Sequence, residues 1–283
     1  MEVNISNWKR VNYFLTGKRV KSWFVDSAKI NWLFKEPAIE GERIAEFVAY
    51  KLGTELFDLK IPETKLADNK GIKGIIVKSF LVEENEQFNL EEAIVFFGSE
   101  FNVNDLSMYK LEIALSICEK YKCIFEFMQM SIFDYIIANQ DRHCENWGFL
   151  SPVSNLNEKR FCPLYDHGST LMCGYNELQI ESYLSDENKF AIYNKNSKTI
   201  FTVGEKKRCK SEIFIKELIN YNSEIFNASY IGFEKYNYDT LKRKISEYLN
   251  GVATENRVEL LAKLVASRIA MVRQWIEEGG ESC

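Results

Sequence analysis

The chain has 283 residues, of which 46% are hydrophobic and 27% are charged, and its formal net charge at pH 7 is −5. A chain of this length and composition can bury a substantial core and fold as one domain with two lobes. The acidic balance argues against a general nucleic-acid binder, whose footprint is a basic domain, but it leaves room for a local basic patch. Only four prolines and fourteen glycines argue against a long linker.

The cysteines and the apolar segments indicate the compartment. Seven cysteines are odd in number, scattered and without a C-x-x-C pair, which fits reduced thiols better than a disulfide framework or a zinc site. The segment from His143 to Glu145 spells the H-x-E of zinc deaminases, but no P-C-x-x-C follows it. The amino terminus lacks an apolar signal region, and no run approaches the roughly 20 apolar residues of a membrane span. We therefore expect a soluble cytoplasmic protein.

The amino-terminal part of the chain is expected to form a five-stranded antiparallel sheet with one helix. Short apolar runs separated by turn residues predict strands at 13–15, 21–25, 30–34, 60–67 and 74–81. A helix is predicted from Gly41 to Leu52, with Gly53 as its C-cap.

Charged side chains next to these elements are candidates for nucleotide contacts. Lys35 emerges from the end of the third strand, where a lysine is either a surface charge or the cation that holds the α and β phosphates. Glu42 and Glu46 lie four residues apart on one face of the predicted helix, so either could pair with Lys35. No glycine-rich phosphate motif occurs in the chain. The turn at residues 16–21 could cover phosphates with backbone N–H groups and Lys18, Arg19 or Lys21.

The second half of the chain is expected to be mainly helical. Helical periodicity is found at 108–118, 124–137, 212–220, 238–249 and 255–278. Residues 83–103 are expected to form a hinge segment and a short helix, and residues 169–204 an irregular segment rich in Ser and Thr. A basic cluster, Lys206, Lys207, Arg208 and Lys210, is either a solvated helix start or a docking surface for an acidic substrate or RNA.

Polar residues that point to chemistry gather between residues 134 and 168. A helix ends before the polar run 139–143, and a β-hairpin then places Asp166 one short hairpin beyond Asn146. Mg²⁺ prefers a few hard oxygen ligands and keeps water and phosphates as the rest of its shell, which Asp166 and the amide oxygen of Asn146 would suit. Asp141, five residues before Asn146, could orient an attacking hydroxyl and accept its proton. This pattern predicts phosphoryl transfer from a metal-bound nucleotide.

These loops resemble those of a known family. The segments DRHCENWGFL (Asp141 to Leu150) and PLYDHGSTL (Pro163 to Leu171) resemble the catalytic and metal loops of the HipA-like bacterial kinases. The first is also similar to the D-R-H-x-x-N loop of the phosphatidylinositol 3/4-kinases. The segment LFKEP around Lys35 resembles the strand-lysine segment of HipA-like proteins. Asp166-His167-Gly168 stands in the place of the D-F-G triplet, with His instead of Phe.

The resemblance implies a two-lobed α+β protein-kinase-like fold that uses ATP and Mg²⁺. We expect an N-lobe at 1–82, with a small antiparallel sheet and one helix, and a mainly helical C-lobe at 83–283. At the catalytic loop, Asp141 is the implied base, His143 braces the loop or touches the γ-phosphate, and Asn146 and Asp166 are the implied metal ligands. At the phosphates, Lys35 is expected to pair first with Glu42, with Lys21 assisting. Around adenine, the expected residues are Val77, Lys78 and Phe80.

Three functions follow from the resemblance and the motifs. Family membership implies phosphorylation of Ser or Thr in a protein, including autophosphorylation, and in some members a toxin with an antitoxin partner. Because the first predicted strand begins near residue 13, we expect no extra amino-terminal domain of the kind that longer toxins carry. The D-R-H-x-x-N match keeps a lipid or small-molecule kinase open. A nucleotide-binding interaction module without turnover is the third hypothesis.

Overall fold

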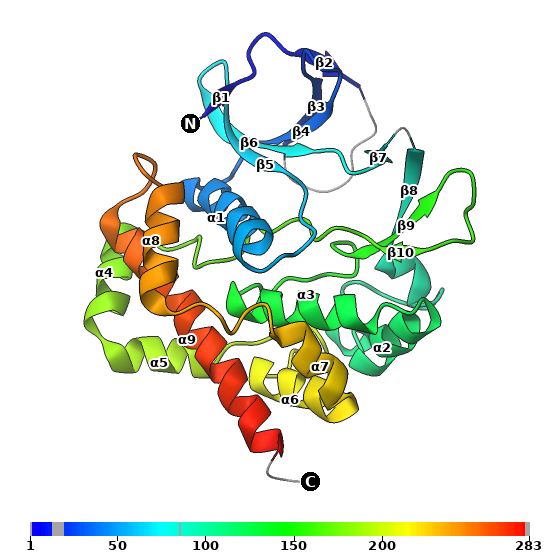
Figure 1. The fold of residues 1–283 in the computed structure, drawn as a ribbon, viewed down its shortest axis with the longest axis vertical. Coiled ribbons are helices and arrows are strands. Elements are labelled where there is room, and N and C mark those ends of the chain that lie inside the picture. Colours follow the sequence, from blue (N-terminus) through cyan, green and yellow to red (C-terminus); the bar gives the residue numbers. More distant parts are fainter. Residues whose placement is uncertain (1, 13–19, 85, 281–283) are drawn as a thin grey trace.

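The computed structural model describes residues 2–12, 20–84 and 86–280. It is a mixed α+β structure in which a curled sheet sits above a larger helical part, with helix α1 between them (Figure 1). The predicted two-lobed arrangement is confirmed, whereas the boundary at residue 82 stays a prediction.

The sheet of the smaller lobe has six described strands in the order β1-β5-β6-β4-β3-β2. Their bounds are Val3–Asn4, Lys9–Val11, Lys21–Val25, Asn31–Lys35, Thr64–Asn69 and Ile72–Lys78 for β1 to β6. The predicted antiparallel sheet is confirmed for β2 to β6. The predicted number of five strands is wrong, because β1 and β2 were missed, and β1 pairs with β5 in parallel. Both are too short for an alternating pattern. The predicted strand at 13–15 lies outside the described residues.

Strand β4 has one buried apolar face and one face turned toward α1. Trp32 and Phe34 are 2% and 1% exposed and pack with Phe24 and Ile76 on one face. Successive side chains of a strand alternate between faces, so Lys35 lies on the opposite face. The sequence alternation of β4 therefore delivers Lys35 to the side of the sheet that faces the helical part.

Helix α1, Glu40–Lys51, continues into a π-helical turn, η1, at Leu52–Leu56. The prediction that Gly53 ends the helix is wrong, since the chain stays helical through it. A Cβ at Gly53 would lie 2.1 Å from Cδ1 of Ile61, so any larger residue there would force the Ile61 side chain to shift. The buried residues Val48 and Ala49 pack α1 into the main core.

A second sheet forms at the junction of the two lobes. Its order is β10-β9-β8-β7, with bounds Val82–Glu83, Glu86–Glu92, Gly148–Pro152 and Arg160–Phe161 for β7 to β10. The predicted hairpin after the polar loop is confirmed as the antiparallel pair β9 and β10. Strand β8 was not expected in the segment predicted as a hinge; the short 3₁₀ helices η2 and η3, Ala93–Phe96 and Leu106–Met108, follow it.

The helical lobe is built around α3, which is buried along most of its length. Its described helices are α2 Leu111–Lys120, α3 Ile124–Ile136, α4 Glu177–Ser185, α5 Glu187–Lys195, α6 Ser211–Tyr221, α7 Ser223–Tyr230, α8 Tyr238–Tyr248 and α9 Glu255–Gly280. The prediction of an irregular segment at 169–204 is wrong, because α4 and α5 lie within it, and both begin at side-chain N-caps, Asn176 and Asp186. Across the described part of the chain, no helix combines the length and apolar character that a bilayer crossing requires.

Candidate active site

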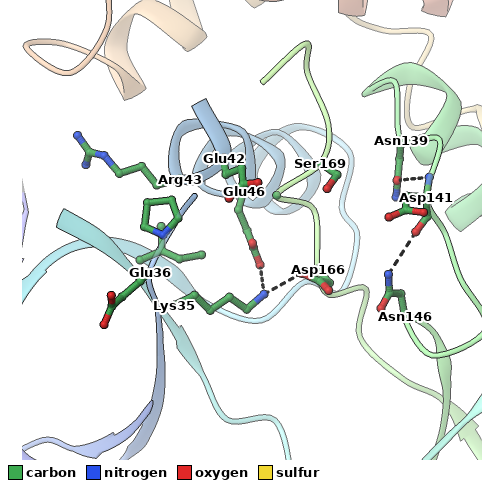
Figure 2. Close-up of a pocket in the computed structure, with 13 residues that line it drawn as sticks. Lys35, Glu36, Glu42, Arg43, Glu46, Asn139, Asp141, Asn146, Asp166 and Ser169 are labelled. Atoms are coloured by element: carbon green, nitrogen blue, oxygen red, sulfur yellow. Dashed lines mark hydrogen bonds and ion pairs between the residues drawn. The ribbon is translucent and has the colours of Figure 1, made fainter. Parts of the chain in front are cut away.

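A cleft of about 210 Å³ opens between the two lobes. Among the predicted site residues, those that line it are Lys35, Glu42, Asp141, Asn146 and Asp166. They come from β4, α1, the loop after α3 and the loop after β10, so segments 131 residues apart in sequence meet here. Figure 2 shows Lys35 and Glu46 on one side of the cleft and Asp141 and Asn146 on the other, with Asp166 between them.

Lys35 joins the two lobes through a pair of carboxylates. Its Nζ lies 2.6 Å from Glu46 Oε1 and 3.1 Å from Asp166 Oδ1 (Figure 2). Burial alone would lower the pKa of Lys35, but the two carboxylates outweigh it and raise that pKa. The Lys35 ammonium lowers the pKa of Asp166 to about 2, against the opposing effect of burial. Lys35 is therefore charged, and Asp166 is ionised at any physiological pH.

The choice of Glu42 as the partner of Lys35 is wrong, and Glu46 takes that place. Glu42 Oε2 accepts a hydrogen bond from the Ala38 amide at 2.8 Å, in the loop that leads into α1. Glu46, one turn later, has a side chain only 7% exposed and directed to Lys35. Burial raises the pKa of Glu46, and the Lys35 ammonium opposes that rise. Glu42 still lines the cleft, and its contact with a nucleotide stays a prediction.

The loop after α3 is fixed by a buried ion pair. Arg142 donates to both carboxylate oxygens of Asp134, from Nη2 at 2.7 Å and from Nε at 2.8 Å. Its Nη1 donates to the carbonyl oxygens of Asn146 and Tyr165 at 2.8 and 2.7 Å. One guanidinium thus holds the end of α3, the Asp141 loop and the residue before Asp166. Asp134, a charged residue between the apolar Phe133 and Tyr135 near the end of α3, was the available signal for this pair.

Asp141 is oriented by its neighbours in the loop. Its backbone amide donates to Asn139 Oδ1 at 3.0 Å, and its carbonyl accepts from Asn146 Nδ2 at 3.2 Å. Its Oδ1 lies 2.5 Å from His143 Nε2, and this hydrogen bond lowers the pKa of Asp141 and raises that of His143. Nδ1 of His143 lies 3.1 Å from the Tyr109 hydroxyl. Asp141 is therefore ionised, and the hydrogen bond from His143 orients its carboxylate.

The Asp166-His167-Gly168 turn places a carboxylate in the cleft and an imidazole in the core. Asp166 has a φ of +61°, and its side chain is half exposed toward the cleft. His167 is 1% exposed, and its ring packs edge-on against Phe133. Burial lowers the pKa of His167, so the ring is neutral. A Cβ at Gly168 would lie 3.2 Å from Glu46 Oε2, so glycine allows α1 to approach the turn closely.

Comparison with known proteins identifies the family. The profile of the HipA-like C-terminal domain matches residues 13–224 of the chain. The chain belongs to this family. The resemblance expected from the DRHCENWGFL and PLYDHGSTL segments is thereby confirmed.

Individual relatives agree with this assignment. The serine/threonine-protein kinase CtkA of Helicobacter pylori is 31% identical over 173 residues, which are 56% of this HipA-like chain and 50% of CtkA. The chain thus spans about half the length of the curated relative that it matches. The crystal structure of the H. pylori proinflammatory kinase CtkA superposes with a TM-score of 0.82 at 18% identity, covering 99% of both chains. HipA from the Shewanella oneidensis HipA, HipB and operator DNA complex gives a TM-score of 0.55 at 11% identity, covering 95% of this chain and 65% of that one. These likenesses show the kinase-like fold.

Other predicted residues of the HipA-like chain surround the cleft without lining it. Lys21 is the cross-strand partner of Lys35 and lies close enough to Asp166 to help lower the pKa of that carboxyl. Val77 is cross-strand from Leu33, on the sheet face that carries Lys35.

Lys78 and Phe80 are not brought to this cleft. Both line a second cavity at the junction of the lobes, and Phe80 stacks on Tyr165 there with ring centroids 5.7 Å apart. The Lys78 amide donates to the Glu63 carbonyl at 2.8 Å, within the first sheet, so the structure does not offer that N–H to adenine. Roles for Val77 and Phe80 in adenine binding stay predictions. Of the predicted phosphate turn, residues 16–19 lie outside the described residues.

The donor set in the cleft suits Mg²⁺ bound together with a nucleotide. Within residues 2–12, 20–84 and 86–280, no three His, Cys, Asp or Glu side chains gather as a self-sufficient metal site. Asp166 and Asn146 supply a carboxylate and an amide oxygen that line the same cleft (Figure 2). Mg²⁺ is usually held by one or two such protein ligands, with phosphate oxygens and water completing its shell. These residues therefore fit a nucleotide-bound magnesium ion.

Proposed function

We propose that the chain is an ATP- and Mg²⁺-dependent kinase that transfers the γ-phosphate to a Ser or Thr hydroxyl of a protein, including its own. The observation that carries this proposal is the Lys35–Glu46 pair joined to Asp166, facing Asp141 and Asn146 across one cleft. This is the set of groups that phosphoryl transfer requires. The likeness to CtkA, which is named a serine/threonine-protein kinase, supports the acceptor class.

Each residue has a distinct role in this proposal. Lys35, held by Glu46, contacts the α and β phosphates, with Lys21 beside it. Asp166 and Asn146 hold Mg²⁺, which when bound neutralises phosphate charge. Asp141 orients the acceptor hydroxyl and accepts its proton as the phosphoryl group departs.

A regulatory protein partner is a further part of the proposal. The HipA structure similar to this chain is a complex with HipB and operator DNA. We propose that a partner of antitoxin type binds this chain as well.

Six cysteines of the described residues are free thiols, which supports a reducing compartment such as the cytoplasm.

The test is phosphate transfer from ATP by the purified chain with Mg²⁺. Autophosphorylation and phosphorylation of serine peptides are measured for wild type, Asp141→Ala and Asp166→Ala. Each variant should lose about 10²-fold or more in rate, because it lacks the base or a metal ligand. Asp239→Ala, an exposed aspartate of α8, is the matched control and should retain wild-type activity.

Other outcomes separate the alternatives. Transfer that survives both substitutions would show that the site lies elsewhere. ATP binding without transfer to any acceptor favours a nucleotide-binding module, and transfer to an inositol lipid in preference to peptides favours a lipid kinase.

A further inference from the structure

Residues 204–210, here called the basic loop, form an exposed cluster of positive charge before α6. Lys206, Lys207 and Arg208 are exposed, and Lys210 is half-buried. An antiparallel bridge places Lys198 beside Lys210, which adds another cation. In the described part of the chain, Lys207 forms the one ion pair of this group, with Asp105 at 3.8 Å, and both side chains are largely exposed. Glu205 is the acidic residue within the loop, so most of the positive charge of the cluster is not balanced by neighbouring carboxylates.

The basic loop is anchored next to the catalytic loop. The Thr202 amide donates to the Tyr109 carbonyl at 2.8 Å, and the Thr202 carbonyl accepts from the Leu111 amide at 3.0 Å. The Tyr109 hydroxyl in turn contacts His143, which supports Asp141. At its far end, the loop is tied down by Cys209, which is buried and whose amide donates to the Phe201 carbonyl at 3.2 Å. The basic loop is therefore anchored to the segment whose Tyr109 contacts the His143 that supports Asp141.

The backbone fixes Arg208 in this position. Its φ is +42°, a left-handed conformation that residues with a Cβ rarely adopt. Such a conformation persists only where the surroundings determine it, and here the buried Cys209 follows directly. Arg208 also lies near enough to Asp141 and His143 for its charge to lower the pKa of each. Its guanidinium thus contributes positive charge near the Asp141 loop.

We infer that the basic loop docks acidic residues next to the Ser or Thr that receives the phosphate. This inference rests on the kinase function proposed above and names its substrate class, an acidic peptide segment. A chain with a net charge of −5 repels acidic partners at long range, so a local cluster is needed to bind one. A protein that contacts about 6–10 phosphates of a nucleic acid needs a larger basic surface than this one. The basic loop with Lys198 offers five cations, which suit a few carboxylates.

The experiment compares three serine peptides that differ only in their flanks, which are Glu, Ala or Lys. Values of kcat and KM are measured for the full chain and for Lys206→Glu with Arg208→Glu, at low and high salt. Wild type should prefer the Glu peptide, and the charge reversal should raise its KM by about tenfold, with less effect at high salt. The control, Lys70→Glu with Lys235→Glu, changes the net charge equally at exposed positions outside the cleft and should keep the preference.

A binding measurement separates this inference from the kinase function. Fluorescence anisotropy of a labelled Glu peptide needs no turnover, and the charge reversal should weaken binding while the control does not. Equal use of all three peptides by wild type overturns acidic docking and leaves the kinase function standing. If the chain transfers no phosphate to any peptide, the proposed kinase function is contradicted. If the charge-reversal variant then binds the Glu peptide as tightly as wild type, acidic docking is overturned as well. If a labelled oligouridine binds more tightly than the Glu peptide at the same salt concentration, acidic docking is overturned in favour of RNA binding.

Discussion

At the scale of a residue, one turn of helix α1 decides whether Glu42 or Glu46 pairs with Lys35. Both were expected on the same face of α1, and both line the cleft. Which of them reaches Lys35 depends on how α1 is rotated against the sheet. That rotation is set by the packing of Val48 and Ala49, which lies in long-range contacts that helical periodicity does not contain.

Substitution of Glu46 by Gln should reduce kcat/KM for ATP by about tenfold or more. The neutral amide removes the buried carboxylate that holds the Lys35 ammonium, so Lys35 is less well positioned for phosphate. Glu42→Gln keeps an acceptor for the Ala38 amide and should change kcat/KM by less than about threefold. Steady-state kinetics of both variants decide between the residues. A larger loss in Glu42→Gln would mean that Glu42, not Glu46, serves the nucleotide.

The His143–Asp141 contact should make stability depend on pH. The hydrogen bond raises the pKa of His143, so the folded protein binds this proton more tightly than the unfolded chain. Its stabilisation is fully present below the unfolded pKa of about 6.5 and is lost as the pH rises through the higher folded value. Urea unfolding of wild type and His143→Gln should therefore differ more at about pH 5.5 than at about pH 9. A difference that stays constant across this range would exclude the charged pair.

At the scale of elements, the buried pair of Asp134 and Arg142 connects α3 to both functional loops. Asp134→Asn should lower the free energy of unfolding by about 3 kcal/mol or more, because it leaves a buried guanidinium without its counter-charge. Glu83→Gln, which breaks the exposed pair with Arg160, is the matched control and should cost less than about 1 kcal/mol. Urea denaturation measures both. Similar values for the two variants would show that the buried pair contributes no more than a surface one.

The elements that sequence reasoning found are those with a strong local signal. Strands β3, β4 and β6 and helices α1 and α3 have periodic apolar residues, and structure is found at each predicted position. Strands β1 and β2 have two and three residues, and their pairing depends on distant segments such as β5. Helix α4 has one buried residue and α5 has two, so their apolar stripes are weak. Their N-cap residues were the usable signal.

At the scale of the whole molecule, the sequence was sufficient for the fold and for part of the site. Asp141, Asn146 and Asp166 lie within one short region, and their spacing predicted that they could converge. Lys35 ends a strand before a proline, which favoured a surface charge, and the Asp141 loop and the resemblance of LFKEP to HipA-like proteins decided for a phosphate contact. The hinge residues Lys78 and Phe80 could not, since the second sheet and the stacking of Phe80 on Tyr165 depend on how the lobes meet.

The bonds of Arg142 also determine how the cleft can move. Asp141, Asn146 and Asp166 are tied through one guanidinium to the end of α3, so these segments move together as a rigid body. Glu46 belongs to α1, which is packed into the main core, whereas Lys35 belongs to β4 of the first sheet. The ion pairs of Lys35 with Glu46 and with Asp166 therefore both join that sheet to the helical part. Tilting the sheet away from the helical part would have to break both pairs, so the position of a single ammonium group reports whether the two sides of the cleft are assembled.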